Sequence, residues 1–309
     1  MAVNRLWQEL FGRGLVGTAD NFGVRGERPT HPELLDWLAV RFREDGWSVK
    51  RLLRTIVLSE TYRQSSHVRP EVLARDPLNR LLARQVRLRL SGELVRDTAL
   101  ASSGLLNRKI GGPSVKPPQP ASVSLEGYRN SWEPSPLADR YRRGLYTFLQ
   151  RTSPFAQLVT FDLPDLSRSC ARRERSNTPL QALQLLNDPV FYEAAQALAE
   201  RVIREGGDDD AVRLECAFRL TLARRPTAVE NRRLLAFLAQ QRTMRTSETP
   251  ASSTAAPATS PTVAGKTGGG GRDGHGRGED GRDEGDAIDP AWVALASVLL
   301  NLDEFITRE

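Results

Sequence analysis

The sequence predicts a mainly α-helical, irregular domain with a Pro/Gly-rich central region and at most one short β-hairpin. Apolar side chains recur at the three- and four-residue spacing of a buried helix face along most of the 309 residues. Capping boxes of the form Thr-x-x-Glu/Gln begin at Thr30, Thr178 and Thr227 and mark helix starts. Between residues 104 and 139 the periodicity stops, because paired glycines and prolines favour turns and extended backbone.

Four helices are predicted in the N-terminal part of the chain: from Thr30 to Gly46, and over residues 48–57, 79–90 and 92–102. Residues 145–149 are ambiguous, since their alternating pattern also fits a short buried strand. The nearby segment that would pair with such a strand is 158–163.

The C-terminal part returns to regular helices. One is predicted from Thr178, with Leu180, Leu183 and Leu186 facing inward, and others follow over residues 189–205, 209–223 and after Thr227.

Residues 243–289 are predicted to be a disordered, low-complexity insert in a helical domain of residues 1–242. The insert has no leucine and no aromatic residue, so it buries too little apolar area to offset the entropy of ordering. Residues 290–309 regain a helical pattern that includes Trp292 and Leu299. Such a helix is poorly soluble alone, and we expect it to pack back on the helical domain.

Hydrophobic residues make up 39% of the chain and charged residues 27%, as in a globular protein. The insert holds five basic and eight acidic residues, so the rest of the chain carries a net charge near +9. A basic surface of this kind attracts polyanions. The arginines are nevertheless spread along helix faces rather than clustered, which argues against nucleic-acid binding.

Several classes of active site are excluded by residue content. The three histidines, His31, His67 and His275, are too few and too scattered for a histidine-based metal site. The sequence has no Gly-x-Ser-x-Gly elbow and no Cys-x-x-Cys-His haem motif. Cys170 and Cys216 form neither a disulfide framework nor a metal-ligand set. We therefore expect no metal and no cofactor in this chain.

The most plausible anion-binding candidate is the arginine-rich segment that leads into the helix starting at Thr178. Free N–H groups at a helix start favour an anion, and arginines add bidentate contacts. The candidate residues are Cys170, Arg172, Arg173, Arg175, Thr178 and Gln181. The alternative, which we favour, is that these arginines bind carboxylates or loop carbonyls of the chain itself, such as those near Asp162 and Asp165.

Asp162 and Asp165 form a second candidate, since two carboxylates close in sequence serve a hard cation or acid–base chemistry. Aspartate beside proline is also ordinary turn chemistry, which is the interpretation we favour. Cys170 would be a nucleophile if the arginines lowered its pKa, but a buried structural cysteine is the simpler hypothesis.

Several motifs together resemble the planctomycete domain-of-unknown-function family fifteen fifty-three. They include Val-Asn-Arg-Leu-Trp at 3–7, Gly-Gly-Pro-Ser-Val at 111–115 and Phe-Asp-Leu-Pro-Asp at 161–165. The others lie at residues 11–16, 22–27, 29–38, 56–65, 76–80, 172–181, 185–188 and 299–305. The resemblance covers nearly everything outside the insert.

The resemblance implies the C-terminal part of a large exported or periplasmic protein, with an uncharacterised domain upstream and often a cytochrome-c-like domain before it. It supplies no catalytic residues. Residues 1–16 do not have the apolar stretch of a signal peptide, and the chain opens almost inside the Asn-Arg-x-Trp motif, so we expect it to lack an N-terminal half. An upstream domain, or a separate protein carrying that half, is the expected partner. Residues 291–302, the most apolar stretch, are too short to span a membrane.

Three functions remain open, and whether the chain is an enzyme is one of the questions. The first is a non-catalytic docking module for the upstream domain or another partner. The second is part of an exported enzyme that acts on polysaccharide or another anionic substrate, with residues 162–181 lining its site. The third is binding of polyanions by a basic surface.

Overall fold

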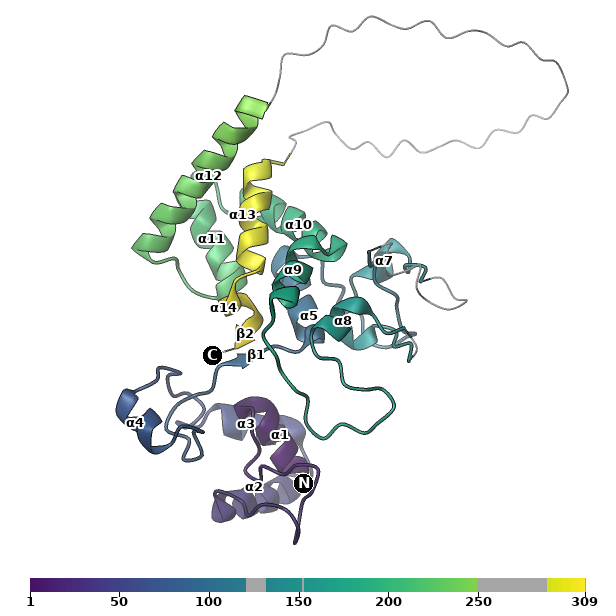
Figure 1. Cartoon of the computed structure of the whole chain (residues 1–309), viewed down its shortest axis with the longest axis vertical. Helices are drawn as coiled ribbons and strands as arrows, with labels where there is room; N and C mark the ends of the chain where they lie inside the picture. The colour runs from purple at the N-terminus through teal and green to yellow at the C-terminus, as the bar shows by residue number, and fades with distance from the viewer. Residues whose placement is uncertain (121–131, 152, 249–287, 309) are drawn as a thin grey trace, which may run out of the picture.

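The computed structural model of the chain describes residues 1–120, 132–151, 153–248 and 288–308. Helices dominate these residues, which confirms the predicted mainly α-helical class. Figure 1 shows two groups of helices with a short sheet between them. The N-terminal group consists of α1 (Ala2–Phe11), α2 (Pro32–Glu44) and α3 (Val49–Val57), followed by the short α4 (Pro70–Arg75). The larger group surrounds α10 (Pro189–Glu205) and α13 (Pro290–Leu300).

The N-terminal group has its own apolar core. The rings of Trp7 and Phe11 on α1 stack with centroids 4.2 Å apart, and Tyr62 meets Phe11 edge-on. Asn4 fixes the loop after α1, because its side chain accepts a hydrogen bond from Val16 N (2.8 Å) and donates one to Val16 O (3.1 Å). The buried residues are Val3, Trp7, Phe11, Leu15, Leu38, Phe42, Leu52 and Ile56.

Helix α10 is the centre of the larger group. It contacts α5 (Gly92–Ser103), α9 (Pro179–Asn187), α11 (Asp210–Leu222) and α13. Ala194, Ala195, Leu198 and Ala199 of α10 are fully buried. Three of these four side chains are methyl groups, so the neighbouring helices can approach closely.

Helix α12 (Ala228–Glu248) covers α13 and begins at the predicted capping box. Thr227 N donates to the Glu230 carboxylate (2.7 Å), and Glu230 N donates to Thr227 Oγ1 (3.3 Å). The helix extends to Glu248, so residues 243–248, which the sequence predicts to be part of the insert, are helical. Residues 249–287 of that insert lie outside the described residues.

The C-terminal segment contributes to the core of the larger group. Trp292, Leu295 and Leu299 on α13 are buried, and Trp292 Nε1 donates to Asp210 (3.2 Å). After α14 (Asp303–Ile306), strand β2 (Thr307–Arg308) pairs antiparallel with β1 (Leu88–Arg89). The last described residues thus lie beside the junction between the two helical groups (Figure 1).

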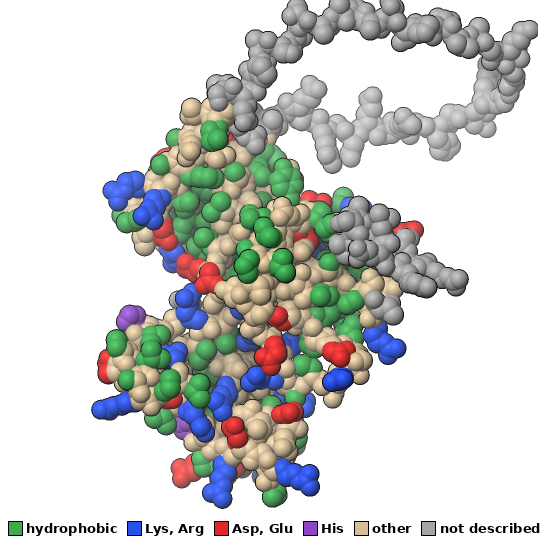
Figure 2. Space-filling view, in the orientation of Figure 1, with side chains coloured by type: hydrophobic (Ala, Val, Ile, Leu, Met, Phe, Trp, Pro, Cys, Tyr) green, Lys and Arg blue, Asp and Glu red, His purple; other side chains and the backbone are tan. Residues whose placement is uncertain are grey.

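Positive charge is concentrated at the N-terminal end of the molecule. Residues 1–90 hold 16 basic and 10 acidic side chains, a net charge of +6 that equals the net charge of the whole chain. Figure 2 shows the basic side chains gathered over the lower, N-terminal part of the surface. The N-terminal end therefore has the larger share of the positive charge of the chain.

Residues 145–149, for which a short strand paired with 158–163 was one interpretation, do not form that strand. Gly144–Tyr146 form the 3₁₀ helix η1, and α8 (Ala156–Thr160) occupies the start of the expected partner segment. Residue Val115 is the partner instead: Val115 N donates to Tyr146 O (2.8 Å), and Phe148 N donates to Val115 O (2.8 Å). The described residues around this point also include α7 (Leu137–Arg140).

Three further local predictions are wrong for identifiable reasons. Residues 79–90 are not a helix, because the Asp76 carboxylate accepts hydrogen bonds from Arg80 N (2.8 Å) and Leu81 N (2.7 Å) and closes a turn. Thr30 does not cap α2, since its hydroxyl donates to Leu15 O (3.3 Å). The leucines of α9 face solvent rather than the core. Their exposed fractions are 68% for Leu180, 52% for Leu183 and 45% for Leu186.

Candidate binding cleft

Asp162 lies at the centre of a network that fixes the loop before α9. Its carboxylate accepts hydrogen bonds from Ser176 N (2.8 Å) and Ser176 Oγ (2.7 Å) and pairs with Arg89. The Arg89 side chain is 8% exposed. Burial raises the pKa of Asp162, but the hydrogen bonds from Ser176 and the charge of Arg89 outweigh it and hold the pKa below 3.8. Asp162 is therefore ionised and paired within the chain.

Thr178 and Gln181 form the second predicted capping box, at the start of α9. Thr178 N donates to Gln181 Oε1 (3.3 Å), while Gln181 Nε2 donates to Thr160 O (3.0 Å) and to Ser176 Oγ (3.1 Å). Because Gln181 is 1% exposed, these bonds tie the start of α9 to the end of α8. Both side chains are used in holding the fold.

A polar cavity of about 840 Å³ collects five of the eight predicted residues, and its opposite wall is the loop at residues 17–20. The five are Asp162, Asp165, Cys170, Arg172 and Arg173. Asp165 is 61% exposed and accepts hydrogen bonds from Ser167 N (2.9 Å) and Ser167 Oγ (2.7 Å), which lower its pKa. Arg172 pairs with Glu174 at 3.1 Å.

The expectation of a buried structural cysteine at position 170 is wrong. Cys170 is exposed, and its Sγ donates to Arg172 O (3.0 Å). The loop before α9 runs over the surface, so the short apolar side chain of Cys170 finds no core to enter.

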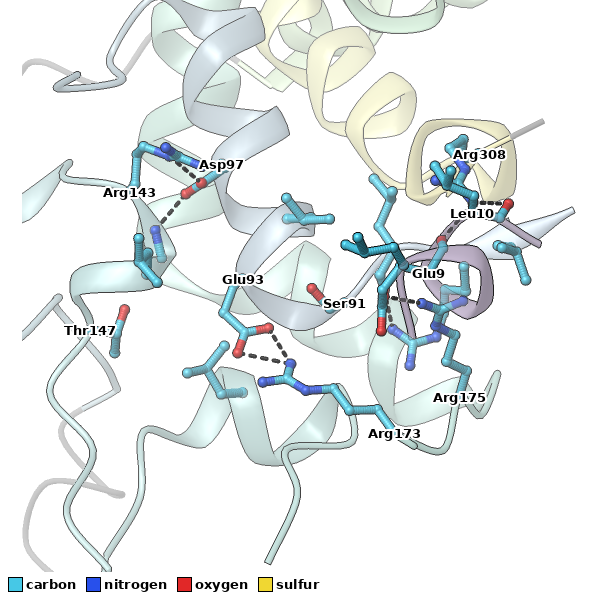
Figure 3. A pocket seen from close by; sticks show the side chains of 18 of the residues that line it. Glu9, Leu10, Ser91, Glu93, Asp97, Arg143, Thr147, Arg173, Arg175 and Arg308 are labelled. Atoms are coloured by element: carbon cyan, nitrogen blue, oxygen red, sulfur yellow. Dashed lines mark hydrogen bonds and ion pairs between the residues drawn. The ribbon is translucent and has the colours of Figure 1, made fainter. Parts of the chain in front are cut away.

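A second cleft, of about 730 Å³, lies between the two helical groups and is drawn in Figure 3. Its walls come from α1, α3, β1, the first turns of α5, η1, α8, β2 and the connecting residues 90–91, 147–149 and 173–175. Nine leucines form the apolar part of the wall: Leu6, Leu10, Leu53, Leu88, Leu90, Leu94, Leu145, Leu149 and Leu158. We call this space the leucine cleft. Five arginines and three carboxylates complete its lining: Arg89, Arg143, Arg173, Arg175, Arg308, Glu9, Glu93 and Asp97.

Two ion pairs cross the α5 side of the leucine cleft (Figure 3). Arg173 Nη1 donates to both carboxylate oxygens of Glu93, at 2.9 and 2.8 Å. Burial raises the pKa of Glu93, but the hydrogen bond and charge of Arg173 outweigh it and lower the pKa below 4.5. Asp97 accepts hydrogen bonds from Arg143 Nε (3.3 Å) and Gly144 N (2.5 Å). These pairs join η1 and the arginine-rich loop to α5.

Gly144 is needed for the close approach of η1 to α5. A Cβ atom at this position would lie 2.8 Å from Glu93 Cα and 2.8 Å from Glu93 O, which are backbone atoms that cannot move aside.

At the α1 end of the cleft, two arginines contact the same residue (Figure 3). Arg175 Nη2 lies 3.4 Å from Glu9 Oε2, and Arg308 Nη2 donates to Glu9 O (3.0 Å) and Leu10 O (2.7 Å). Burial lowers the pKa of Arg175; Glu9 opposes this effect, while the charges of Arg308 and Arg173 add to it. The positive charges of Arg175, Arg308 and Arg173 therefore act on one another at this end of the cleft.

The structure brings two predicted residues, Arg173 and Arg175, into the leucine cleft, whereas Arg89, Arg143 and Arg308 were not predicted. No local pattern marks these three, because their partners lie in distant parts of the sequence.

Among residues 1–120, 132–151, 153–248 and 288–308, no group of three or more His, Cys, Asp and Glu is placed to bind a metal ion. Within the same residues, no helix is both long and apolar enough to cross a bilayer.

Comparison with known proteins identifies one family. No curated protein and no solved structure is significantly similar to the chain. A family model matches residues 1–238, which include α1 to α11 and all of the leucine cleft except Arg308. The chain therefore belongs to the PSD1 family, described as "Protein of unknown function (DUF1553)".

Proposed function

We propose that the chain is a non-catalytic docking module that binds a segment of a partner polypeptide in the leucine cleft. The observation that carries the proposal is the convergence of nine leucines on one open cleft, seven of them from six different secondary-structure elements. Leu94, Leu145 and Leu149 are 46%, 71% and 45% exposed there. An exposed apolar cluster with a charged rim is typical of an interaction site.

The charged groups beside the cleft support docking rather than chemistry. Asp162 pairs with Arg89, Glu93 with Arg173, Asp97 with Arg143, and Arg172 with Glu174. A catalytic acid or base must reach the reacting atom, and these carboxylates already have partners in the chain. The upstream domain of the same protein, or a separate protein, is the proposed source of the docked segment.

The test is selection of a random-peptide display library on the full chain. Enriched peptides are then labelled with fluorescein and titrated by fluorescence anisotropy. We expect Leu145→Glu to weaken binding about tenfold, because a charge would enter the apolar wall. Leu81→Glu is the matched control, since Leu81 is also 71% exposed but lies outside the leucine cleft. Failure to enrich any peptide, or equal binding by the two variants, contradicts the proposal.

A second candidate is part of an enzyme that acts on polysaccharide or another anionic substrate in the polar cavity. The observation in its favour is that Asp162, Asp165, Cys170, Arg172 and Arg173 line the same space. Of the two predicted carboxylates, Asp165 is the less constrained, at 61% exposed against 21% for Asp162. The test is release of reducing ends from a sulfated polysaccharide, with Asp165→Asn as the variant. No release by the unaltered chain, or release that Asp165→Asn leaves unchanged, removes this candidate.

A further inference from the structure

The α1 end of the leucine cleft has an excess of positive charge. Three arginines line this end. Arg175 and Arg308 both contact Glu9, and Arg173 pairs with Glu93. Across the whole lining, five arginines face three carboxylates. The N-terminal end of the molecule, which supplies one side of the cleft, also carries the net positive charge of the chain.

The contact between Arg175 and Glu9 is the weakest ion pair of the cleft. Its N···O distance is 3.4 Å, against 2.8 Å for Arg173 and Glu93, and the Glu9 side chain is 67% exposed. Exposed pairs of this kind contribute little, because water competes for both groups. Glu9 can therefore leave Arg175 at small cost.

Arg308 retains unused hydrogen-bond donors beside Arg175. Both of its hydrogen bonds come from Nη2 and go to backbone carbonyls of α1, so they leave its charge without a carboxylate partner among the described residues. Nη1 and Nε make no hydrogen bond to any residue that the structure describes. Two guanidinium groups arranged in this way can bind the two oxygens of one carboxylate.

We infer that the segment bound in the leucine cleft is acidic as well as aliphatic, and that one of its carboxylates binds between Arg175 and Arg308 in place of Glu9. This inference rests on the proposed docking function and names the chemistry of the partner. The exposed leucines of the cleft, Leu94, Leu145 and Leu149, contact the aliphatic side chains of the segment, and the arginines favour its negative charge. The described lining contains no aromatic residue, so it lacks the flat surface on which sugar rings stack.

The experiment compares two fluorescein-labelled peptides by anisotropy. Leucine alternates with glutamate in the first peptide, and every glutamate is glutamine in the second. We expect the full chain to bind the acidic peptide about tenfold more tightly at low salt, as charge-assisted hydrogen bonds predict. The preference should shrink as salt is added, because salt screens partly exposed charges.

Three variants locate the effect. Arg175→Gln should reduce the preference for the acidic peptide to about twofold, whereas Arg168→Gln, an 86%-exposed arginine outside the cleft, should leave it unchanged. Glu9→Gln should strengthen binding of the acidic peptide about two- to fivefold and leave the glutamine peptide unaffected, because it removes the competing carboxylate. Thermal unfolding of each variant shows whether it is folded.

Equal binding of the two peptides, or a preference that Arg175→Gln leaves intact, overturns the inference while the docking function stands. Weaker binding of the acidic peptide by Glu9→Gln also overturns it. If neither peptide binds but vesicles of phosphatidylglycerol do, the ligand is a lipid, and both the inference and the docking function are wrong.

Discussion

Replacing Asp162 by asparagine should destabilise the fold without altering its shape. Asparagine has the same size, and it tolerates the positive φ of 61° at this position as well as aspartate does. The substitution removes the charge that pairs with Arg89, whose side chain is 8% exposed, and weakens the two hydrogen bonds from Ser176. A hydrogen bond to a charged group contributes about 1.5–3 kcal/mol, and a buried arginine left unpaired adds to the loss. We expect the free energy of unfolding to fall by about 2–3 kcal/mol.

Urea unfolding followed by far-UV circular dichroism measures this change, with Asp165→Asn as the matched control. The Asp165 carboxylate is 61% exposed, and among the described residues its polar partners are Ser167 and Arg168. Its substitution should therefore leave the free energy of unfolding unchanged. Equal values for the two variants would refute the structural role assigned to Asp162 and would return this carboxylate to the set of candidate functional groups.

The pH dependence of the same difference is a further check on this reasoning. Because the folded-state pKa of Asp162 lies below 3.8, the unfolded chain binds more protons than the folded chain at acid pH. The stabilisation by Asp162 is therefore complete above a pH of about 5 and disappears as the pH falls through the folded-state pKa. If the difference in free energy of unfolding between the unaltered chain and Asp162→Asn grows toward acid pH instead, the reasoning is wrong.

Two other substitutions test the larger helical group. Leu295→Ala, at a fully buried position of α13, should lower the free energy of unfolding by about 2–5 kcal/mol. Val298→Ala, at a position 37% exposed on the same helix, should lower it much less. Equal losses in urea unfolding would contradict the packing described. Hydrogen bonds from Arg224 lower the pKa of Glu230 to about 2. The difference in free energy of unfolding between the unaltered chain and Glu230→Gln should therefore be at its full value above pH 4.5 and vanish as the pH falls toward 2. A difference that persists unchanged at low pH would refute the pairing.

Helices with strong local signals could be predicted from the sequence. The capping box at Thr227 and the apolar face of α10 needed only residues close to one another in the chain. The exposed leucines of α9 show the limit of this reasoning. Their spacing is typical of a buried face, yet Gln181 and Leu185 on the other side of the helix are the buried residues. Periodicity indicates that a helix has an apolar face, but contacts with the neighbouring helices determine which face is buried.

The candidate site was predicted only in part, for a related reason. Arg173 and Arg175 stand out because they belong to a visible run of arginines. Arg308 looks like any charged residue near the end of a chain, and its importance comes from its contact with the last turn of α1. The sheet that positions Arg308 consists of two-residue strands from distant parts of the sequence, which are too short to leave a pattern.

The dependence of α10 on α13 has a practical consequence for anyone who expresses this protein. The family match stops at residue 238, inside α12, and a gene trimmed to that boundary would lack Trp292, Leu295 and Leu299. The product would expose an apolar groove along α10, and we expect it to form inclusion bodies or to be bound by chaperones. Supplying residues 288–308 as a separate peptide should rescue the trimmed protein, since the missing helix would then fill the groove from outside.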